Sequence, residues 1–97
     1  MIRAEIIANQ SVQDNIVDSI ELSVPGIRYT ILPLVYGRGR KDRKLGTTTW
    51  PETNFMIISY IDENKSEPFC RAVFDVKRQF PCEGIKLFLS DAREETW

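Results

Sequence analysis

The sequence predicts a single α+β domain whose elements follow one another in the order βαββαβ. Two segments repeat apolar residues at helical spacing, four have the composition or alternation of strands, and proline, glycine or polar residues separate most of them. The chain has 97 residues, of which 42% are apolar and 28% charged, as in an ordinary folded protein. We therefore expect one domain over residues 1–97.

The first strand is expected over residues 2–8, and the first helix directly after it. The strand residues that share one face are apolar: Ile2, Ala4, Ile6 and Ala8. Ser11 then offers its hydroxyl as an N-cap, with Asp14 three residues later as in a capping box. Within the helix, apolar residues recur at every fourth position: Val12, Ile16, Ile20 and Val24. Pro25 and Gly26 end this helix.

Two strand candidates flank the most highly charged stretch of the chain. Residues 27–36 are rich in β-branched and aromatic side chains, and Pro33 favours an edge strand because proline cannot donate to a central ladder. Residues 54–61 read NFMIISYI, a nearly continuous apolar run that is typical of a strand buried on both faces. Residues 36–51 are then a long loop between these two strands.

A second helix and a last strand complete the order. Ser66, Glu67 and Pro68 supply a polar cap and a proline in the first turn of the helix, and Pro81 closes it. Its apolar residues follow at helical spacing: Phe69, Val73, Val76 and Phe80. Over residues 84–90 the last strand alternates two sets of side chains: Ile85, Leu87 and Leu89 against Lys86, Phe88 and Ser90.

This order of elements is that of the ferredoxin-like fold, in which right-handed crossovers place both helices on the same face of an antiparallel sheet. The other face of the sheet is then uncovered. Because the strand over residues 54–61 is apolar on both of its faces, the uncovered face would expose a patch of the kind that marks an interface. We therefore expect a homo-oligomer whose sheets face inward.

The composition narrows the classes of function. The chain has no histidine, which removes the usual general base near neutral pH and the commonest neutral metal ligand. Asp62, Glu63 and Glu67 cluster where a helix starts, and acidic residues are ordinary there. We expect no enzyme, no catalytic residue and no metal site. Cys70 and Cys82 are too few for a disulfide scaffold and are expected to be small buried thiols.

Other features of the sequence exclude particular relatives and compartments. The chain lacks the C-x-x-C of copper chaperones, the arginine-bearing loop of acylphosphatases and the aromatic strand pattern of RNA-recognition modules. The first ten residues lack the apolar run of a signal peptide, and no window is long and apolar enough to span a membrane. We expect a cytoplasmic protein that does not insert into a membrane.

The loop over residues 36–51, YGRGRKDRKLGTTTWP, is called the projecting loop below. It collects five cations in a chain whose net charge is −1: Arg38, Arg40, Lys41, Arg43 and Lys44. Such a block either stays solvated or presents its donors to an anion. Nucleic acid is a poor candidate, because the net charge leaves no wider basic surface. A small anion or a protein partner fits better.

The order of elements and the start of this loop resemble the PII signal-transduction family. In that family the second strand runs into V-x-G-x-G-R at the root of a long projecting loop, and this chain has VYGRGR over residues 35–40. The resemblance implies a trimer that binds adenine nucleotides in clefts between subunits. It also implies that the loop contacts a partner, commonly a membrane transporter or an enzyme.

The resemblance assigns roles to particular positions. The expected ligand-binding residues lie at the loop root and on the last strand: Gly37, Arg38, Gly39, Arg40, Lys41 and Lys86. Glycine permits positive φ and a close backbone approach to phosphate, and arginine supplies planar donors. The expected partner contacts are Arg43, Lys44 and Trp50. For Gly37 and Gly39, a purely structural role in turning the strand stays open, as does an outward-facing surface role for Lys86.

The chain also departs from the family pattern. The glutamine that follows G-R in many members is Lys41, and no tyrosine lies between Gly37 and Pro51, so oxoglutarate sensing and uridylylation are not expected. The glycine-rich T-G-x-x-G-D-G-K-I-F loop is QFPCEGIKLF over residues 79–88, and the C-terminal arginines are reduced to Arg93. The ligand is therefore left as an adenine nucleotide or another small anion.

The return of the loop, WPETN over residues 50–54, is similar to a divergent PII-like branch often associated with transport proteins. Trp50 before a fixed proline suits either packing against a neighbouring subunit or contact with a partner. A trimer of the CutA-like type, acting as a structural or interaction module without nucleotide binding, is the alternative. It fits the expected packing but not the G-x-G-R loop root.

Overall fold

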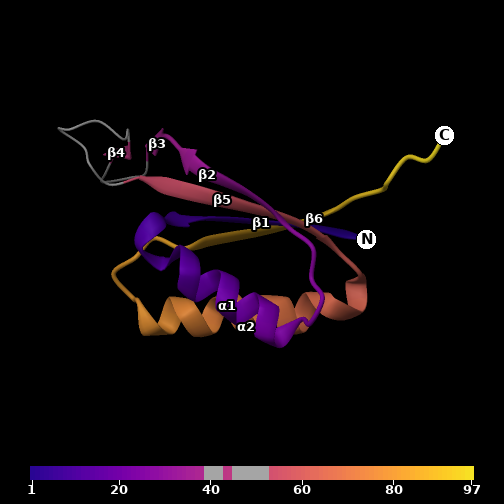
Figure 1. The fold of residues 1–97 in the computed structure, drawn as a ribbon, viewed down its shortest axis with the longest axis horizontal. Helices are drawn as coiled ribbons and strands as arrows, with labels where there is room; N and C mark the ends of the chain where they lie inside the picture. The colour runs from indigo at the N-terminus through magenta and orange to yellow at the C-terminus, as the bar shows by residue number, and fades with distance from the viewer. Residues whose placement is uncertain (39–42, 45–52) are drawn as a thin grey trace.

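A computed structural model describes residues 1–38, 43–44 and 53–97 of the chain. Its main sheet has four antiparallel strands in the order β2-β5-β1-β6, and a two-stranded ribbon, β3-β4, lies beyond the end of β2 (Figure 1). The strands are β1 (Ile2–Asn9), β2 (Thr30–Val35), β3 (Gly37–Arg38), β4 (Arg43–Lys44), β5 (Asn54–Ile61) and β6 (Lys86–Asp91). The helices are η1 (Gln10–Val12), α1 (Gln13–Ser23), η2 (Glu63–Lys65) and α2 (Ser66–Gln79). The predicted ferredoxin-like order βαββαβ is confirmed.

The two longest strands form the centre of the sheet. β1 pairs with β5 from Ile2↔Ile61 to Asn9↔Asn54, and with β6 along its other edge. β2 is an edge strand, as Pro33 predicted, and its register with β5 shifts between Leu32 and Val35, on either side of that proline. The strand boundaries at residues 54 and 61 agree with the sequence prediction.

The strand expected from Ile27 begins later, at Thr30. After α1 ends at Ser23, Gly26 adopts a φ of 79°, the left-handed region that glycine enters at little cost. The Ile27 amide then donates to the Val24 carbonyl at 3.1 Å, so residue 27 still belongs to the turn. The predicted helix stop at Pro25 and Gly26 is thus confirmed, and the start of the following strand is corrected.

The start of the first helix differs from the expected capping box. The Asn9 side chain, not that of Ser11, is the cap: its Oδ1 accepts a hydrogen bond of 2.8 Å from the Ser11 amide. A 3-10 turn over Gln10–Val12 follows, and α1 begins at Gln13. Asparagine at the end of a strand satisfies the first free amides as well as serine does, and here it stands earlier in the chain.

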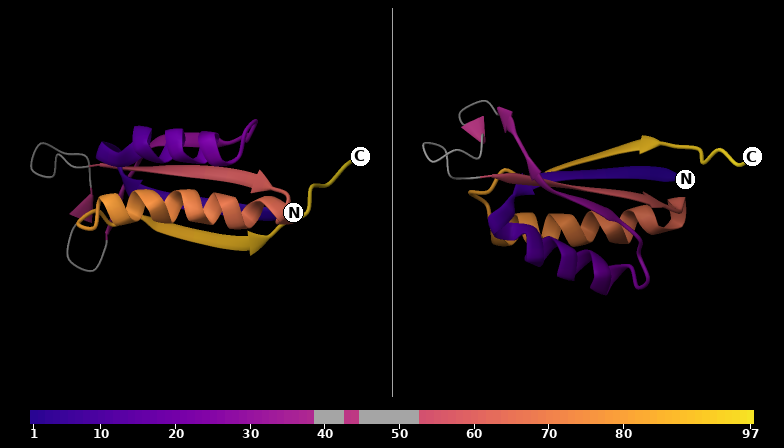
Figure 2. Two further views of the ribbon diagram at one scale, coloured as in Figure 1. Left: turned by 90° about the horizontal axis from the view of Figure 1, so that it is seen from below. Right: turned by 45° about the horizontal axis from the view of Figure 1, so that its top comes forward.

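Both helices cover the same face of the sheet and lie side by side (Figure 2). Ser19 Oγ of α1 donates to the Ala72 carbonyl of α2 at 2.9 Å, which fixes the two helices against each other. The core between the helices and the sheet is apolar: Ala4, Ile6, Ala8, Val12, Ile16, Ile20, Val24, Phe55, Ile57, Ile61, Phe69, Ala72, Val73, Val76 and Ile85. Full burial of one large apolar side chain here stabilises the fold by about 1.5–3 kcal/mol.

The face of the sheet that the helices do not cover is called the open face below. Alternation along β5 buries Phe55 and Ile57 under the helices and places Met56 and Ile58 on the open face. β5 is therefore apolar on both faces, as predicted. Across residues 1–38, 43–44 and 53–97, no helix combines the length and the apolar character needed to cross a membrane.

Candidate functional site

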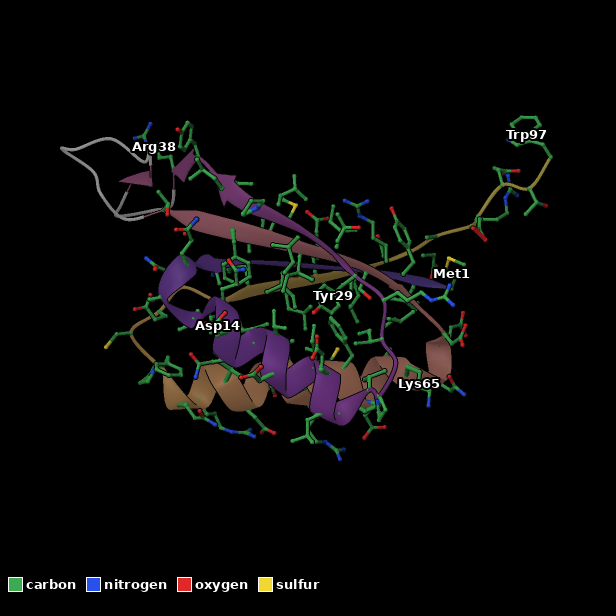
Figure 3. All side chains as sticks on the ribbon, in the orientation of Figure 1. Met1, Asp14, Tyr29, Arg38, Lys65 and Trp97 are labelled. Carbon is green, nitrogen blue, oxygen red and sulfur yellow. The ribbon has the colours of Figure 1, made fainter. Side chains whose placement is uncertain are left out.

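The root of the projecting loop forms the short ribbon β3-β4. Gly37 pairs with Lys44 and Arg38 with Arg43, so this ribbon continues the chain beyond the end of β2 (Figure 1). The side chain of Arg38 is exposed and points away from the body of the domain (Figure 3). Other expected site residues lie outside the part that the structure describes: Gly39, Arg40, Lys41 and Trp50. For Arg43 and Lys44 the structure describes the backbone alone.

Gly37 does not need the conformational freedom that the sequence suggested. Among the described residues, Gly26 is the glycine with positive φ, so Gly37 lies in a region open to any residue. A Cβ built at Gly37 would lie 3.9 Å from Asn54 Nδ2, an ordinary van der Waals distance. The fold within one chain therefore tolerates a larger residue at this position.

Lys86 lies at the same end of the sheet as Gly37 but at the opposite edge. It is the first residue of β6, pairs with Ile7 of β1 and is exposed. Gly37 follows β2, at the other edge, so three strand spacings of roughly 14 Å in total separate the two strands. The predicted ligand-binding residues thus share one end of the domain without forming one cluster.

A second cationic region lies at the far end of the sheet, where the chain termini also lie. One hollow of about 310 Å³ is lined by Met1, Tyr60, Arg93 and Glu94. A second hollow of about 240 Å³ lies between the turn after α1 and the end of β5, and Arg28, Asp62 and Lys65 are among its lining residues. Figure 3 places Lys65 and Met1 at this end and Arg38 at the other.

Sequence reasoning named Arg93 only as a remnant of the family's C-terminal arginines, and it did not single out Arg28 or Lys65. These two cations are distant in sequence and meet only because the turn after α1 and the turn after β5 pack at the same end of the fold. The available signal was topological, since strands that are antiparallel neighbours bring the start of one beside the end of the other. The distribution of charges along the sequence does not indicate that Arg28 and Lys65 lie close together.

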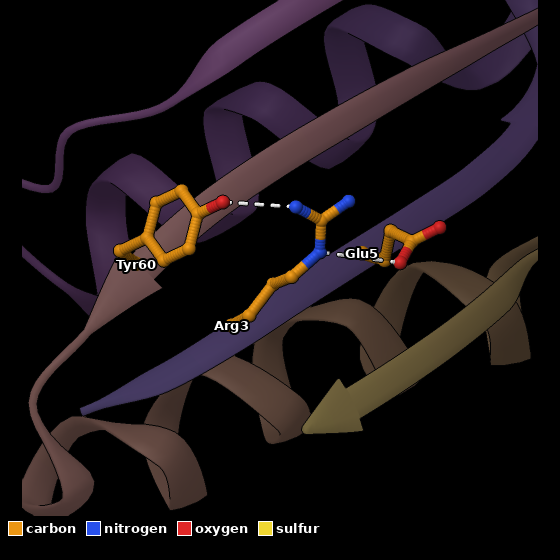
Figure 4. A network of polar contacts seen from close by, with 3 residues as sticks. All are labelled: Arg3, Glu5 and Tyr60. Atoms are coloured by element: carbon orange, nitrogen blue, oxygen red, sulfur yellow. Dashed lines mark hydrogen bonds and ion pairs between the residues drawn. The ribbon is translucent and has the colours of Figure 1, made fainter. Parts of the chain in front are cut away.

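A polar network crosses the centre of the open face (Figure 4). Arg3 Nη1 donates to the Tyr60 hydroxyl at 2.8 Å, and Arg3 Nε donates to Glu5 Oε2 at 3.4 Å. The guanidinium carbon also lies 5.8 Å from the centroid of the Tyr60 ring, within the range of a cation–π contact. The hydrogen bond with Tyr60 raises the pKa of Arg3, and an arginine side chain is a cation at physiological pH in any case.

The two cysteines differ from each other and from the prediction. Cys70 on α2 is partly buried, and burial raises the pKa of its thiol, which makes it less nucleophilic at neutral pH. Cys82 is exposed in the turn after α2, so the expectation that both are buried is wrong for Cys82. Within the described residues, no group of three or more His, Cys, Asp or Glu side chains is placed to hold a metal ion.

Comparisons with known proteins extend this picture. The sequence matches no protein-family model and no curated protein. The structure is similar to that of CPII, a nitrogen regulatory PII-like protein from Thiomonas intermedia bound to ADP, AMP and bicarbonate. The TM-score is 0.72 at 21% sequence identity, over 92% of this chain and 82% of that one.

Two further solved structures agree. A putative PII-like signaling protein from Thermus thermophilus matches with a TM-score of 0.66 at 17% identity, over 92% of this chain and 83% of that one. A DUF3240 family protein from Shewanella baltica matches with a TM-score of 0.65 at 12% identity, over 99% of this chain and 94% of that one. The fold that the loop root suggested is thus confirmed, and this chain has the ferredoxin-like α+β fold of PII-like proteins.

Proposed function

We propose that this chain is a divergent PII-like regulatory protein that assembles as a homotrimer and binds a small anionic molecule between subunits. The observation that carries this proposal is the division of cationic residues between the two ends of a domain with a PII-like fold. Neither end by itself surrounds an anion. Each end supplies half of a site.

The distance between the two ends requires more than one copy. β5 has eight residues and spans the sheet from end to end, so roughly 25 Å separates Arg38 from the hollows at the other end. No small anion bridges that distance within one chain. In the head-to-tail ring that we propose, the loop end of one copy faces the far end of the next, so that Arg38 and Lys86 would join Arg28, Lys65 and Arg93 of the neighbour.

An adenine nucleotide, with or without bicarbonate, is the ligand class that fits best. CPII binds ADP, AMP and bicarbonate, and both ends of this chain offer the guanidinium and ammonium donors that phosphate and carbonate oxygens accept from. Regulation would follow from the loop. A ligand shifts the equilibrium between two loop conformations only if its affinity for them differs, and contacts to Arg38, Arg40 or Lys41 provide that difference.

The partner side of the proposal rests on the rest of the projecting loop. Arg43, Lys44 and Trp50 combine two cations with one large amphipathic ring, which suits a protein surface with acidic and apolar parts. A membrane transporter or an enzyme is the proposed partner class. No catalytic role is assigned to this chain, which would act in the cytoplasm.

Calorimetric titration tests the ligand site. Wild-type protein is titrated with ADP in the presence and absence of bicarbonate, and compared with Arg38→Ala and Arg40→Ala. Each variant is expected to bind at least about 10-fold more weakly, because each loses hydrogen bonds between charged groups. Arg71→Ala on α2, whose exposed side chain pairs with Glu67, is the matched control and should bind as wild type does. Equal affinities for all the proteins would contradict this site.

The CutA-like alternative has one observation in its favour. In the segment before β6, residues 79–85, Gly84 is the single glycine and adopts no positive φ, so the backbone lacks the glycine-rich cradle of a phosphate loop. An assembled trimer that gives no heat with nucleotide or bicarbonate would favour this module. The same result with a monomer would contradict both readings.

A further inference from the structure

The strand register arranges the open face in cross-strand rows. Next to the loop end, Leu32, Met56, Ile7 and Lys86 lie side by side, followed by Thr30, Ile58, Glu5 and Phe88, and then by Tyr60, Arg3 and Ser90. Five of these side chains form an apolar surface: Leu32, Met56, Ile7, Ile58 and Phe88. Phe88 is 55% exposed and Leu32 38%, so this surface faces solvent in a single copy.

Glu5 lies in the middle of that apolar surface. Across the strands its neighbours are Ile58 and Phe88, and along β1 they are Arg3 and Ile7. Among the described residues its partner is Arg3, through one contact of 3.4 Å, which is long for a hydrogen bond between charged groups. The Glu5 carboxylate therefore has capacity to accept further hydrogen bonds.

Arg3 has matching unused capacity. Its Nη1 and Nε groups are engaged by Tyr60 and Glu5, whereas no contact is drawn to Nη2 in Figure 4, where the helices lie behind the sheet. In the contacts formed by the described residues, neither Arg3 Nη2 nor Glu5 Oε1 has a partner. Both groups stand on the uncovered side, available to another molecule.

We propose that Arg3 of one copy binds Glu5 of a neighbouring copy, and that this pair sets the register of self-association through the open face. The inference rests on the proposed assembly and adds the contact that specifies it. A partner with one sign of charge would bury either Arg3 or Glu5 with only their single mutual contact of 3.4 Å as compensation, at a cost in free energy. A second copy presents both charges and can satisfy both.

The pairing also explains why a charged residue occupies this position. Apolar contacts among Met56, Ile58 and Phe88 supply attraction but tolerate sliding by a residue pair along the strands. A buried carboxylate permits only the arrangement in which a guanidinium reaches it. The network thus selects one arrangement of copies among several that would bury similar apolar area.

Charge reversal in separate chains tests the pairing. Arg3→Glu and Glu5→Arg are each expected to lower the association constant by roughly 100-fold or more, because each places like charges together in the interface. A mixed trimer of the two variants has opposite charges at two of its three interfaces and like charges at the third, so mixing is expected to form mixed complexes and to restore association only in part. Carrying both reversals on one chain should also restore association. Sedimentation velocity and native mass spectrometry measure these states.

Two controls separate this inference from the assembly itself. Met56→Arg breaks the apolar surface without touching the pair, and Arg71→Glu reverses an exposed charge on α2, away from the open face. If Met56→Arg leaves the mass of the assembled complex unchanged, the proposal of self-association through the open face is wrong. If Met56→Arg dissociates the protein while both reversals at Arg3 and Glu5 assemble normally, the pairing is wrong and the assembly stands.

Milder variants cover the case in which a reversed chain does not fold. Arg3→Met leaves Glu5 without its partner and should weaken association, while Arg3→Met combined with Glu5→Leu should restore it. Far-ultraviolet circular dichroism of each variant verifies its fold. Single reversals that fold, dissociate and show no preference for mixed over unmixed complexes in native mass spectrometry would place the pair within one copy and overturn the inference.

Discussion

The two faces of the sheet differ in how far their polar side chains find hydrogen-bond partners within the same chain. On the helix-covered face the buried polar side chain is Ser59, and its hydroxyl donates to the Arg28 carbonyl at 2.7 Å, inside the same chain. On the open face Glu5 stands among apolar neighbours with one long contact to Arg3. The first face is complete within one copy, and the second has unused polar groups. An apolar strand face therefore indicates a core when its polar members are satisfied and an interface when they are not.

The sharpest test of this comparison replaces adjacent residues of β5 that point to opposite faces. Phe55→Ala, under the helices, is expected to lower the free energy of unfolding by about 3–5 kcal/mol at any protein concentration. Met56→Ala should change the stability of the dilute monomer by less than about 0.5 kcal/mol. Urea titrations at nanomolar and micromolar protein concentrations measure both. If both variants lost the same free energy of unfolding in the dilute samples, the two faces of the sheet would not differ in their contribution to the stability of one copy.

The polar residues give a second, smaller contrast. Ser59→Ala removes the hydroxyl of the buried Ser59, the donor to the Arg28 carbonyl, and is expected to cost about 1 kcal/mol. Ser90→Ala, on the exposed part of β6 beside Arg3, is the matched change on the open face and should cost almost nothing. Thermal unfolding of both variants measures the difference. A loss for Ser90→Ala as large as that for Ser59→Ala would show that the open face also carries satisfied structural hydrogen bonds.

The spacing of apolar residues predicted most of the fold, because the residues on each face of the sheet follow a recognisable pattern in the sequence. The apolar run in β5 and the fourfold repeats of the helices predicted the order of the elements and the uncovered face of the sheet. Pro33 predicted that β2 is an edge strand. Where local signals compete, the sequence was less decisive. Asn9 and Ser11 are both good caps, and after the turn at Gly26 the strand begins three residues later than the apolar stretch predicts, at Thr30 instead of Ile27.

The candidate site was less predictable than the fold for a different reason. The sequence singles out Gly37 and Arg38 as candidates because they are close together in the chain and follow a known pattern, and their role in binding stays a prediction. Arg28 and Lys65 belong to separate turns that only the sheet topology brings to one end. Cys82 illustrates the same limit, since composition favours burial of cysteine but its turn leaves it exposed. Residues at the loop tip stay a sequence-based prediction, outside residues 1–38, 43–44 and 53–97.

A further prediction concerns the residue that caps the first helical turn after β1. Asn9→Ala removes the side chain that accepts from the Ser11 amide, and it is expected to lower the free energy of unfolding by about 1 kcal/mol. Ser11→Ala, the residue expected as the cap from sequence, should change stability by only a few tenths. Chemical denaturation of the pair measures this. A larger loss for Ser11→Ala would restore the original capping prediction.

The smallest expected effect concerns pH. It involves the hydrogen bond that the hydroxyl of Tyr29, the residue before β2, donates to the carboxylate of Glu21 on α1. This bond raises the pKa of Tyr29 above that of an unfolded chain, because phenol ionisation would abolish the donor beside a carboxylate. A group whose pKa is higher in the folded state stabilises the protein fully below the unfolded pKa, near 10, and loses that contribution as the pH rises through the folded pKa. Because both groups are close to solvent, the contribution amounts to a few tenths of a kcal/mol. Tyr29→Phe should therefore slightly lower stability at pH 8 and remove part of its decline above pH 10, as followed by urea titration across that range. An unchanged alkaline decline would mean that the bond contributes nothing to folding, and that α1 is held on the sheet by apolar packing alone.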